Sequence, residues 1–337
     1  MLEQTELEKY DKQKMFQVYN EWPKIAQKCY NDNFKKISFK KSDHIIFAGM
    51  GGSGAICDVF SAILSKTGIH TEVIKGYDIP KTVDKETIVI ITSVSGNTEE
   101  TLSILEASNK ISKKIVCFSN GGKIEEVCKE NNVEFRKIPM EHSPRASFIA
   151  YLYSMLKILE PILPIEERDV IESIKELENT KKIISSNNLN STNKALNLAK
   201  WIQGIPIIYF PWGLQAVAIR FKNSLQENAK CHAIVENIIE TSHNGIVAWE
   251  NKQEVCPILI EGADDHPKTI ERWNILREFF KGKVDFGEVH SVNGNILSKL
   301  INLIYLLDYA TIYLAIMKKT DPTPVESIDW IKKQLEK

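Results

Sequence analysis

The sequence predicts an α/β protein with two similar domains, each built around a central parallel sheet. Short apolar runs typical of buried strands alternate with amphipathic helical patterns, and such alternation is typical of βαβ units on a parallel sheet. The alternation occurs twice along the chain. Its 337 residues leave room for two domains of roughly 150 residues each. We therefore expect the second half to repeat the architecture of the first.

The first domain is predicted for residues 44–160, after an N-terminal helical segment at 1–43. Its strands are expected in the runs HIIFAG, HTEVIKG, TIVIITS, KIVCFS and VEFRKI, between residues 44 and 138. A long apolar helical pattern, RASFIAYLYSMLKILE, follows and ends at Pro161, since proline cannot continue a helix. This helix completes the first α/β/α unit.

Residues 161–193 are expected to connect the two domains. EERDVIESIKELENTKKII has the pattern of a charged amphipathic helix, and SSNNLNSTN at 185–193 has turn composition without periodicity, which indicates a linker. The second domain, with a C-terminal tail, is predicted for 194–337. Its strands are expected in IPIIYF, CPILIEG and KVDFGEVHS, and its helices in LQAVAIRFKNSLQENAK, around ERWNILREFFKG, and from Asn295 to Met317.

The composition favours a globular protein that acts on small molecules. Hydrophobic residues make up 43% of the chain, charged residues 26%, and the net charge is -1, so nothing indicates affinity for nucleic acid or membrane. The N-terminus MLEQTELEKYDKQKMF lacks the pattern of a secretory signal, and no run approaches about 18 uninterrupted apolar residues. We expect a cytoplasmic protein.

Cysteine and histidine usage gives no metal signature. The six cysteines are scattered without CxxC spacing, and the seven histidines show neither HExxH nor another tight ligand spacing. We expect reduced, packing cysteines, no bound metal and no cofactor.

Glycines follow the first strand in IIFAGMGGSGAICD, where Gly49, Gly51 and Gly54 satisfy G-x-G-x-x-G. This pattern is the dinucleotide fingerprint, but alone it is a weak signal. Glycine permits close backbone approach, and a helix N-terminus presents free N–H groups to any phosphate. The unit therefore predicts a phosphate site at Gly51, Gly52 and Ser53. It does not identify the ligand as NAD.

A second turn, in ITSVSGNTEETLSIL, follows another strand and offers the hydroxyls of Ser93, Ser95 and Thr98. A phosphomonoester has three oxygens to satisfy and gains from two converging loops. The plainer alternative is a capped helix start and nothing more. A third interpretation is an NAD-dependent oxidoreductase, with Asp78 near the expected ribose position.

The second domain carries IIYFPWGLQAVAIRFKN where the first carries IIFAGMGGSGAICDVFSA. This copy is expected to have lost the glycines, so if the two halves are duplicates, the sequence predicts that the anion site survives only in the first domain.

The motifs GMGGSG and SVSGNTEETL resemble the sugar isomerase (SIS) domain, which binds phosphosugars. The chain from about residue 44 onward is similar to the bifunctional phosphoglucose/phosphomannose isomerases of archaea and bacteria, through SPRAS (143–147), ENAK (227–230), HNGIVAWE (243–250) and DPTPVESID (321–329). The resemblance implies two SIS-type, flavodoxin-like α/β/α sandwich domains. It further implies metal-independent interconversion of glucose 6-phosphate and mannose 6-phosphate with fructose 6-phosphate through a cis-enediolate.

The resemblance also assigns roles to five residues. Glu227 matches the family's catalytic base, and a carboxylate poised near neutral pKa suits proton abstraction from carbon. His243 matches the ring-opening histidine, which the neighbouring subunit of a homodimer supplies. Arg145 corresponds to the group that stabilises the enediolate, since a guanidinium is always charged. Lys332 aligns with a lysine near the ring oxygen, and Thr323 lies where dual specificity for the two epimers is expected to arise.

Two other functions stay open from the sequence. One is a phosphosugar-binding regulator, since SIS domains also serve as sensors, although no helix-turn-helix pattern or basic patch is evident. The other is an isomerase of a different phosphosugar, because phosphate recognition is common to all of them. The chain departs from the family pattern in CHAIVENIIETS after ENAK and at Val94, where an aromatic residue is common; neither change removes a catalytic group.

Overall fold

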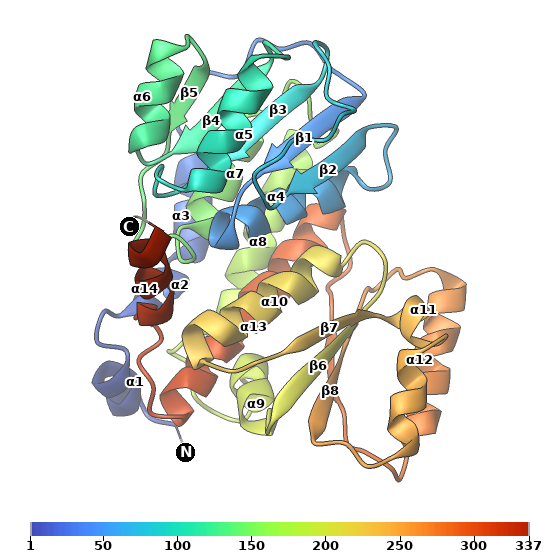
Figure 1. Cartoon of the computed structure of the whole chain (residues 1–337). Coiled ribbons are helices and arrows are strands. Elements are labelled where there is room, and N and C mark those ends of the chain that lie inside the picture. Colours follow the sequence, from blue (N-terminus) through green and yellow to red (C-terminus); the bar gives the residue numbers. More distant parts are fainter. Residues whose placement is uncertain (1, 336–337) are drawn as a thin grey trace.

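The computed structural model describes residues 2–335 and contains two parallel sheets, with a thick layer of helices between them (Figure 1). Sheet A belongs to the first half of the chain and sheet B to the second. Both sheets have all neighbouring strands parallel. The predicted fold class, two α/β/α units with central parallel sheets, is confirmed.

Sheet A has the order β2-β1-β3-β4-β5, which is the flavodoxin-like order. Its central strands β1, β3 and β4 are buried almost along their whole length, as expected for a sheet covered on both faces. The strands are β1 (His44–Ala48), β2 (His70–Ile74), β3 (Ile88–Thr92), β4 (Ile115–Ser119) and β5 (Glu134–Lys137). The helices between them are α4 (Gly51–Leu64), α5 (Glu99–Asn109) and α6 (Lys123–Glu130).

Sheet B has the order β7-β6-β8-β9 and so repeats the first four positions of sheet A. The strands are β6 (Ile205–Phe210), β7 (Ile234–Asn237), β8 (Val255–Glu261) and β9 (Gly287–His290). The helices are α9 (Lys194–Trp201), α10 (Gln215–Ala229), α11 (Ile238–Thr241), the short 3₁₀ helix η1 (Gly245–Glu250), α12 (Pro267–Phe280) and α13 (Ile296–Met317). Strand β7 was not predicted, because this edge strand is only partly buried and includes Glu236 and Asn237.

The helices between the sheets form the main apolar core. In this layer α13 packs against α8 (Glu167–Ile184), α9 and α10, and α3 (Trp22–Asn31) packs against α7 (Phe148–Ile158). One hydrophobic cluster runs continuously through it, and smaller clusters lie on the outer face of each sheet. α13 is the only helix in residues 2–335 long and apolar enough to cross a membrane, and 94% of that stretch is buried inside the protein.

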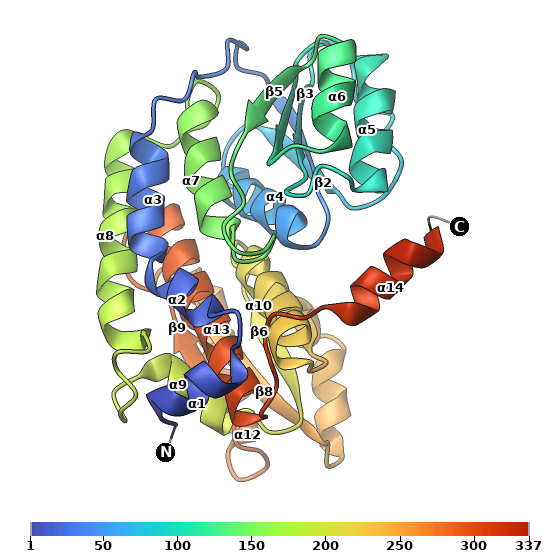
Figure 2. The ribbon, with the colours of Figure 1, turned by 90° about the vertical axis from the view of Figure 1, so that its left-hand side faces the viewer.

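Helices lie near both ends of the described residues. The N-terminal segment forms α1 (Gln4–Tyr10), α2 (Met15–Asn20) and α3, and the C-terminal tail ends in α14 (Glu326–Leu335). Figure 2 shows α14 extending away from the body of the protein, and none of its residues is buried. The predicted linker at 185–193 is a turn held by Asn193, whose buried side chain caps α9 and donates to Asn188 O.

Candidate active site

The two predicted phosphate loops meet at the carboxyl ends of β1 and β3. Gly51 begins α4 with φ +53°, and Ser53 follows in the first helical turn. The Ser53 hydroxyl accepts a hydrogen bond from Val94 N at 3.2 Å. The loops therefore touch through Ser53, and both present helix N-termini, which favour an anion.

The loop after β3 places the remaining predicted hydroxyls. Ser93 Oγ accepts from Gly96 N at 3.2 Å and lies 3.2 Å from Thr98 Oγ1, and Ser95 Oγ accepts from Asn97 N. Thr98 is the N-cap residue of α5, but its side chain makes no capping hydrogen bond. Its hydroxyl is therefore not committed to the helix end, which argues against the plain capping interpretation of this loop.

Arg145 lies directly beside the first loop. A Cβ on Gly52 would come within 3.2 Å of Arg145 Cα and 3.3 Å of Pro144 O, so glycine is what allows the two segments to pack so closely. Arg145 is only 4% exposed, and Arg220 Nη2, which also pairs with the fully buried Asp308, donates to Arg145 O at 2.8 Å. The backbone that carries the predicted anion-stabilising group is thus anchored in the core.

The guanidinium of Arg145 is held on three sides. Nε donates to Asn228 Oδ1 at 2.7 Å, and Nη2 donates to Pro322 O at 2.6 Å and to Thr323 O at 2.7 Å. The third nitrogen, Nη1, points to Glu227 Oε2 at 3.4 Å. The structure therefore brings together Arg145, Glu227 and Thr323 from three distant parts of the chain.

Thr323 adds a free hydroxyl to this group. Its Oγ1 is buried and has no hydrogen-bond partner among the described residues, which is costly unless a bound molecule supplies one. Its backbone N–H donates to Asp321 Oδ1, so the turn that carries it is fixed.

Two residues of the ENAK motif support this site, although neither was assigned a role from the sequence. Asn228, fully buried, links Arg145 to Thr311 by donating to its hydroxyl at 2.8 Å. Lys230, in a left-handed conformation with φ +54°, donates to Glu227 O at 2.5 Å and Pro324 O at 2.7 Å. Desolvation, together with the positive charge of Arg145, lowers the pKa of Lys230. In the sequence, the only indication of these supporting roles is that Asn228 and Lys230 flank Ala229, close to Glu227.

The structure does not bring His243 and Lys332 to this site within one chain. Glu227 lies near the end of α10, before β7, whereas His243 is exposed in the turn that follows α11, beyond the carboxyl end of β7. The four residues of β7 alone span about 10 Å. Lys332 is exposed on α14, which extends away from the body of the protein (Figure 2).

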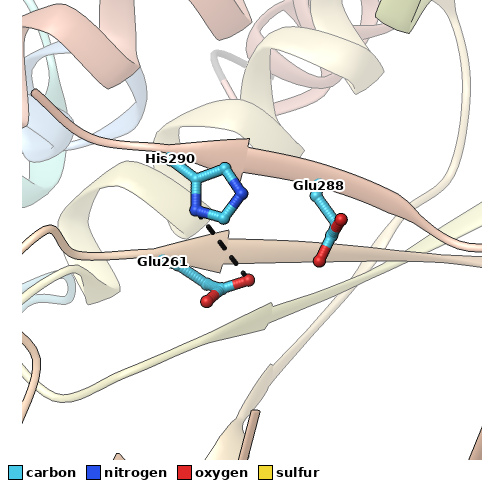
Figure 3. A group of neighbouring side chains, drawn as sticks. All are labelled: Glu261, Glu288 and His290. Carbon is cyan, nitrogen blue, oxygen red and sulfur yellow. Dashed lines mark ion pairs between the residues drawn. The ribbon is translucent and has the colours of Figure 1, made fainter. Parts of the chain in front are cut away.

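A separate group of possible metal ligands lies at the carboxyl ends of β8 and β9. Glu261, Glu288 and His290 each offer an atom within 4.8 Å of the others (Figure 3). Arg277 already pairs with both carboxylates, with Nε 2.5 Å from Glu288 Oε1. Burial raises the pKa of Glu261, and this guanidinium opposes that rise. A cation would have to displace Arg277, so we assign no metal site here, and the absence of a metal stays a prediction.

Fold and site together define a protein with two sugar isomerase domains. Residues 38–160 match the SIS domain family, and residues 191–335 match the bacterial phospho-glucose isomerase C-terminal SIS domain. The C-terminal domain of a glucosamine-fructose-6-phosphate aminotransferase from Francisella tularensis has the same fold, with a TM-score of 0.67 at 19% identity over 92% of this chain and 98% of that one.

Two curated relatives identify the family more closely. The bifunctional phosphoglucose/phosphomannose isomerase of Caldicellulosiruptor bescii is 32% identical, over 95% of this chain and 98% of the relative. That of Aquifex aeolicus is also 32% identical, over 87% and 90% respectively. The chain belongs to the family of bifunctional phosphoglucose/phosphomannose isomerases.

Proposed function

We propose that this protein interconverts glucose 6-phosphate and mannose 6-phosphate with fructose 6-phosphate, through a cis-enediolate and without a metal or cofactor. One observation carries the proposal: the Glu227 carboxylate lies 3.4 Å from a fixed Arg145 guanidinium, next to two loops suited to a phosphate. Membership of the family and the names of its relatives support the choice of substrates.

The proton transfer needs a base and a nearby positive charge. Glu227 takes the proton from carbon 2 of the open-chain aldose and returns it to carbon 1, while the hydroxyl proton of oxygen 2 moves to oxygen 1, so no atom is lost and no electron acceptor is needed. Arg145 stabilises the negative charge that develops on the enediolate oxygens. Because Arg145 is held by Asn228 and by two backbone carbonyls, little reorganisation is needed when that charge appears.

The remaining contacts are proposed from the family pattern. His243 of a second subunit opens the sugar ring, Lys332 lies near the ring oxygen, and Thr323 leaves room for either epimer at carbon 2. The positions of Glu227 and His243 on either side of β7 support a homodimer with shared active sites. We place the enzyme in the cytoplasm and expect no nucleic-acid or membrane partner.

A coupled assay of fructose 6-phosphate formation tests the activity. With chelator present, both glucose 6-phosphate and mannose 6-phosphate should be turned over, and Glu227→Gln should abolish both reactions. Glu278→Gln, on the exposed face of α12, is the matched control. Absence of turnover with either sugar would point to a sensor or to another phosphosugar, and a chelator-sensitive, zinc-restored activity would refute the metal-free mechanism.

Subunit mixing tests the donated histidine. Glu227→Gln and His243→Ala homodimers should each be inactive. Randomly mixed dimers should regain about one quarter of the parent activity, because half are heterodimers and each heterodimer has one intact site. If His243 acts within its own chain, mixing restores nothing.

A further inference from the structure

A cavity of about 540 Å³ lies at the carboxyl end of sheet B, where the second domain meets α4 of the first. It occupies the crevice between β6 and β8, where the strand order of sheet B reverses. This crevice is the usual ligand position in open parallel sheets, and small-molecule sites have volumes of about 300–1,000 Å³. No residue of the phosphate loops and none of Arg145, Glu227 and Thr323 lines it.

The turn after β6 keeps the essential geometry of the turn after β1. Gly51 comes three residues after the end of β1 and Gly213 three residues after the end of β6, and their φ values are +53° and +93°. A Cβ on Gly213 would meet no atom within 4 Å, so open space lies beside it. A second cavity, of about 450 Å³, adjoins at this glycine.

The helix after this turn, α10, has backbone N–H donors at its N-terminus that have no partner in the described part of the chain. α10 begins at Gln215 without a side-chain cap, whereas the side chains of His266 and Asn295 cap the neighbouring helices α12 and α13. Among residues 2–335, the N–H groups of Gln215 and Ala216 have no acceptor. They line the adjoining cavity, beside Gly213.

Side chains of both charges and an indole complete the cavity. Lys66, at the end of α4, lies over the ring of Trp212, with Nζ 5.6 Å from the ring centroid. Within the described chain no carboxylate lies within 4 Å of Lys66, although its charge acts on Asp264 and Asp265, which line the same cavity. Lys299 is only 7% exposed and pairs with Asp264 at 2.5 Å. Trp212 itself is 61% exposed, so the part of its ring that Lys66 does not cover is open to a ligand.

We propose that this crevice is a second ligand site, for a phosphorylated small molecule that carries a ring, a phosphosugar or a nucleotide. The phosphate lies beside Gly213 on the free amides of α10, and Lys66 balances its charge. The ring stacks on Trp212, and its hydroxyls meet the Asp264–Lys299 pair. Because Lys66 belongs to the first domain and Trp212 to the second, the ligand bridges the two domains.

Calorimetric titration of the full chain tests the site. Fructose 6-phosphate and, separately, adenosine monophosphate are titrated into Glu227→Gln protein, so that nothing is turned over. The double variant Lys66→Ala/Trp212→Ala in that background should lose one binding equivalent per chain for at least one ligand. Loss for fructose 6-phosphate identifies a phosphosugar site, and loss for adenosine monophosphate a nucleotide site.

The matched control is Lys281→Ala, an exposed lysine at the far end of α12, which should keep every equivalent. Both altered side chains of the double variant are exposed, so thermal unfolding should stay close to that of the parent. If the double variant binds as many equivalents of each ligand as the control, the proposal is wrong. That result would leave the isomerase assay unaffected, because the phosphate loops and Glu227 are not altered by these two substitutions.

Discussion

At the carboxyl edge of sheet A the first turn is GMGGSG, and at the same edge of sheet B it is PWGLQ. Both turns follow a central strand and lead into a helix of similar length, α4 or α10. The first turn is lined by glycines and hydroxyls, and the second by an exposed indole and charged pairs. The same backbone path thus supports two different surfaces.

The comparison corrects the expectation that the second turn lost its glycines. One glycine, Gly213, remains at the position of Gly51, and both have positive φ. What the second turn lacks is the pair that permits close packing, since a Cβ on Gly52 would lie 3.2 Å from Arg145 Cα and one on Gly54 would lie 2.7 Å from Gly49 O. The backbone requirement of the turn has been kept in both domains, whereas close approach to a neighbouring segment is specific to the first.

The largest effect is expected from a change to Arg145, the positive charge beside the sheet A site. Arg145→Lys should lower kcat by about 10²–10³-fold, because an ammonium cannot replace a guanidinium that spans Asn228, two carbonyls and Glu227. The measurement is steady-state turnover of both sugar phosphates. Arg168→Lys, on an exposed arginine of α8, should keep the parent rate. Parent-like turnover by Arg145→Lys would remove this residue from the reaction.

The next largest effect is on stability, and it compares a glycine at the edge of sheet A with one at the edge of sheet B. In Gly96→Ala the new Cβ would lie 1.6 Å from Gly121 O, at φ +72°, so we expect a loss of more than ~3 kcal/mol of unfolding free energy. Gly213→Ala has only the strain of φ +93° with open space around it, and we expect a loss of ~1–2 kcal/mol. Urea unfolding of both variants measures the difference. Equal losses would mean that the loops of sheet A are not closely packed around Gly96.

Local pattern predicted the sheets well, because central strands are continuous apolar runs and their helices have clear periodicity. The runs at 44–49, 87–93 and 114–119 became β1, β3 and β4. The prediction failed at β7, an edge strand in which polar residues follow Ile234 and Val235 and only one side pairs with a neighbour. Without that strand, the separation of Glu227 from His243 could not have been foreseen.

The candidate site was predictable in part, for a similar reason. The phosphate loops have local signatures, glycine and hydroxyl at strand ends, that follow from the chemistry of the ligand. Arg145, Glu227 and Thr323 come from segments more than 80 residues apart, and no local rule connects them, so only the family resemblance grouped them. The supporting roles of Asn228 and Lys230 depend on tertiary contacts and emerged with the structure alone.

A smaller effect concerns substrate affinity. Ser93→Ala/Thr98→Val removes two hydroxyls from the phosphate loop, and each hydrogen bond to a charged group contributes about 1.5–3 kcal/mol. We expect KM to rise at least about 10-fold with kcat within a few-fold, since the phosphate is bound equally in ground and transition states. The control is Ser103→Ala. Ser103 lies in α5 and its hydroxyl donates to Tyr77 O, so this variant should keep both constants. A fall in kcat at constant KM would contradict the phosphate role.

The smallest effect belongs to the carboxyl edge of sheet B. Burial raises the pKa of Asp265 above its ordinary 3.8, against hydrogen bonds from Trp273 and Gly262 N. A carboxyl whose pKa is higher in the folded state binds its proton more tightly there, so its contribution to stability is present below about pH 3.8 and is lost as pH rises through the folded pKa. Asp265→Asn should therefore weaken the decline in stability above pH 3.8. Because the side chain is only half-buried, the change should stay below the ~1.4 kcal/mol of one pKa unit.

Urea unfolding of parent and variant at pH 4 and pH 7 measures this change in the free energy of unfolding. A steeper decline in the variant would show that the two hydrogen bonds outweigh burial. In that case the edge of sheet B would stabilise a negative charge, and its difference from the predicted anion-binding edge of sheet A would be smaller than burial alone implies.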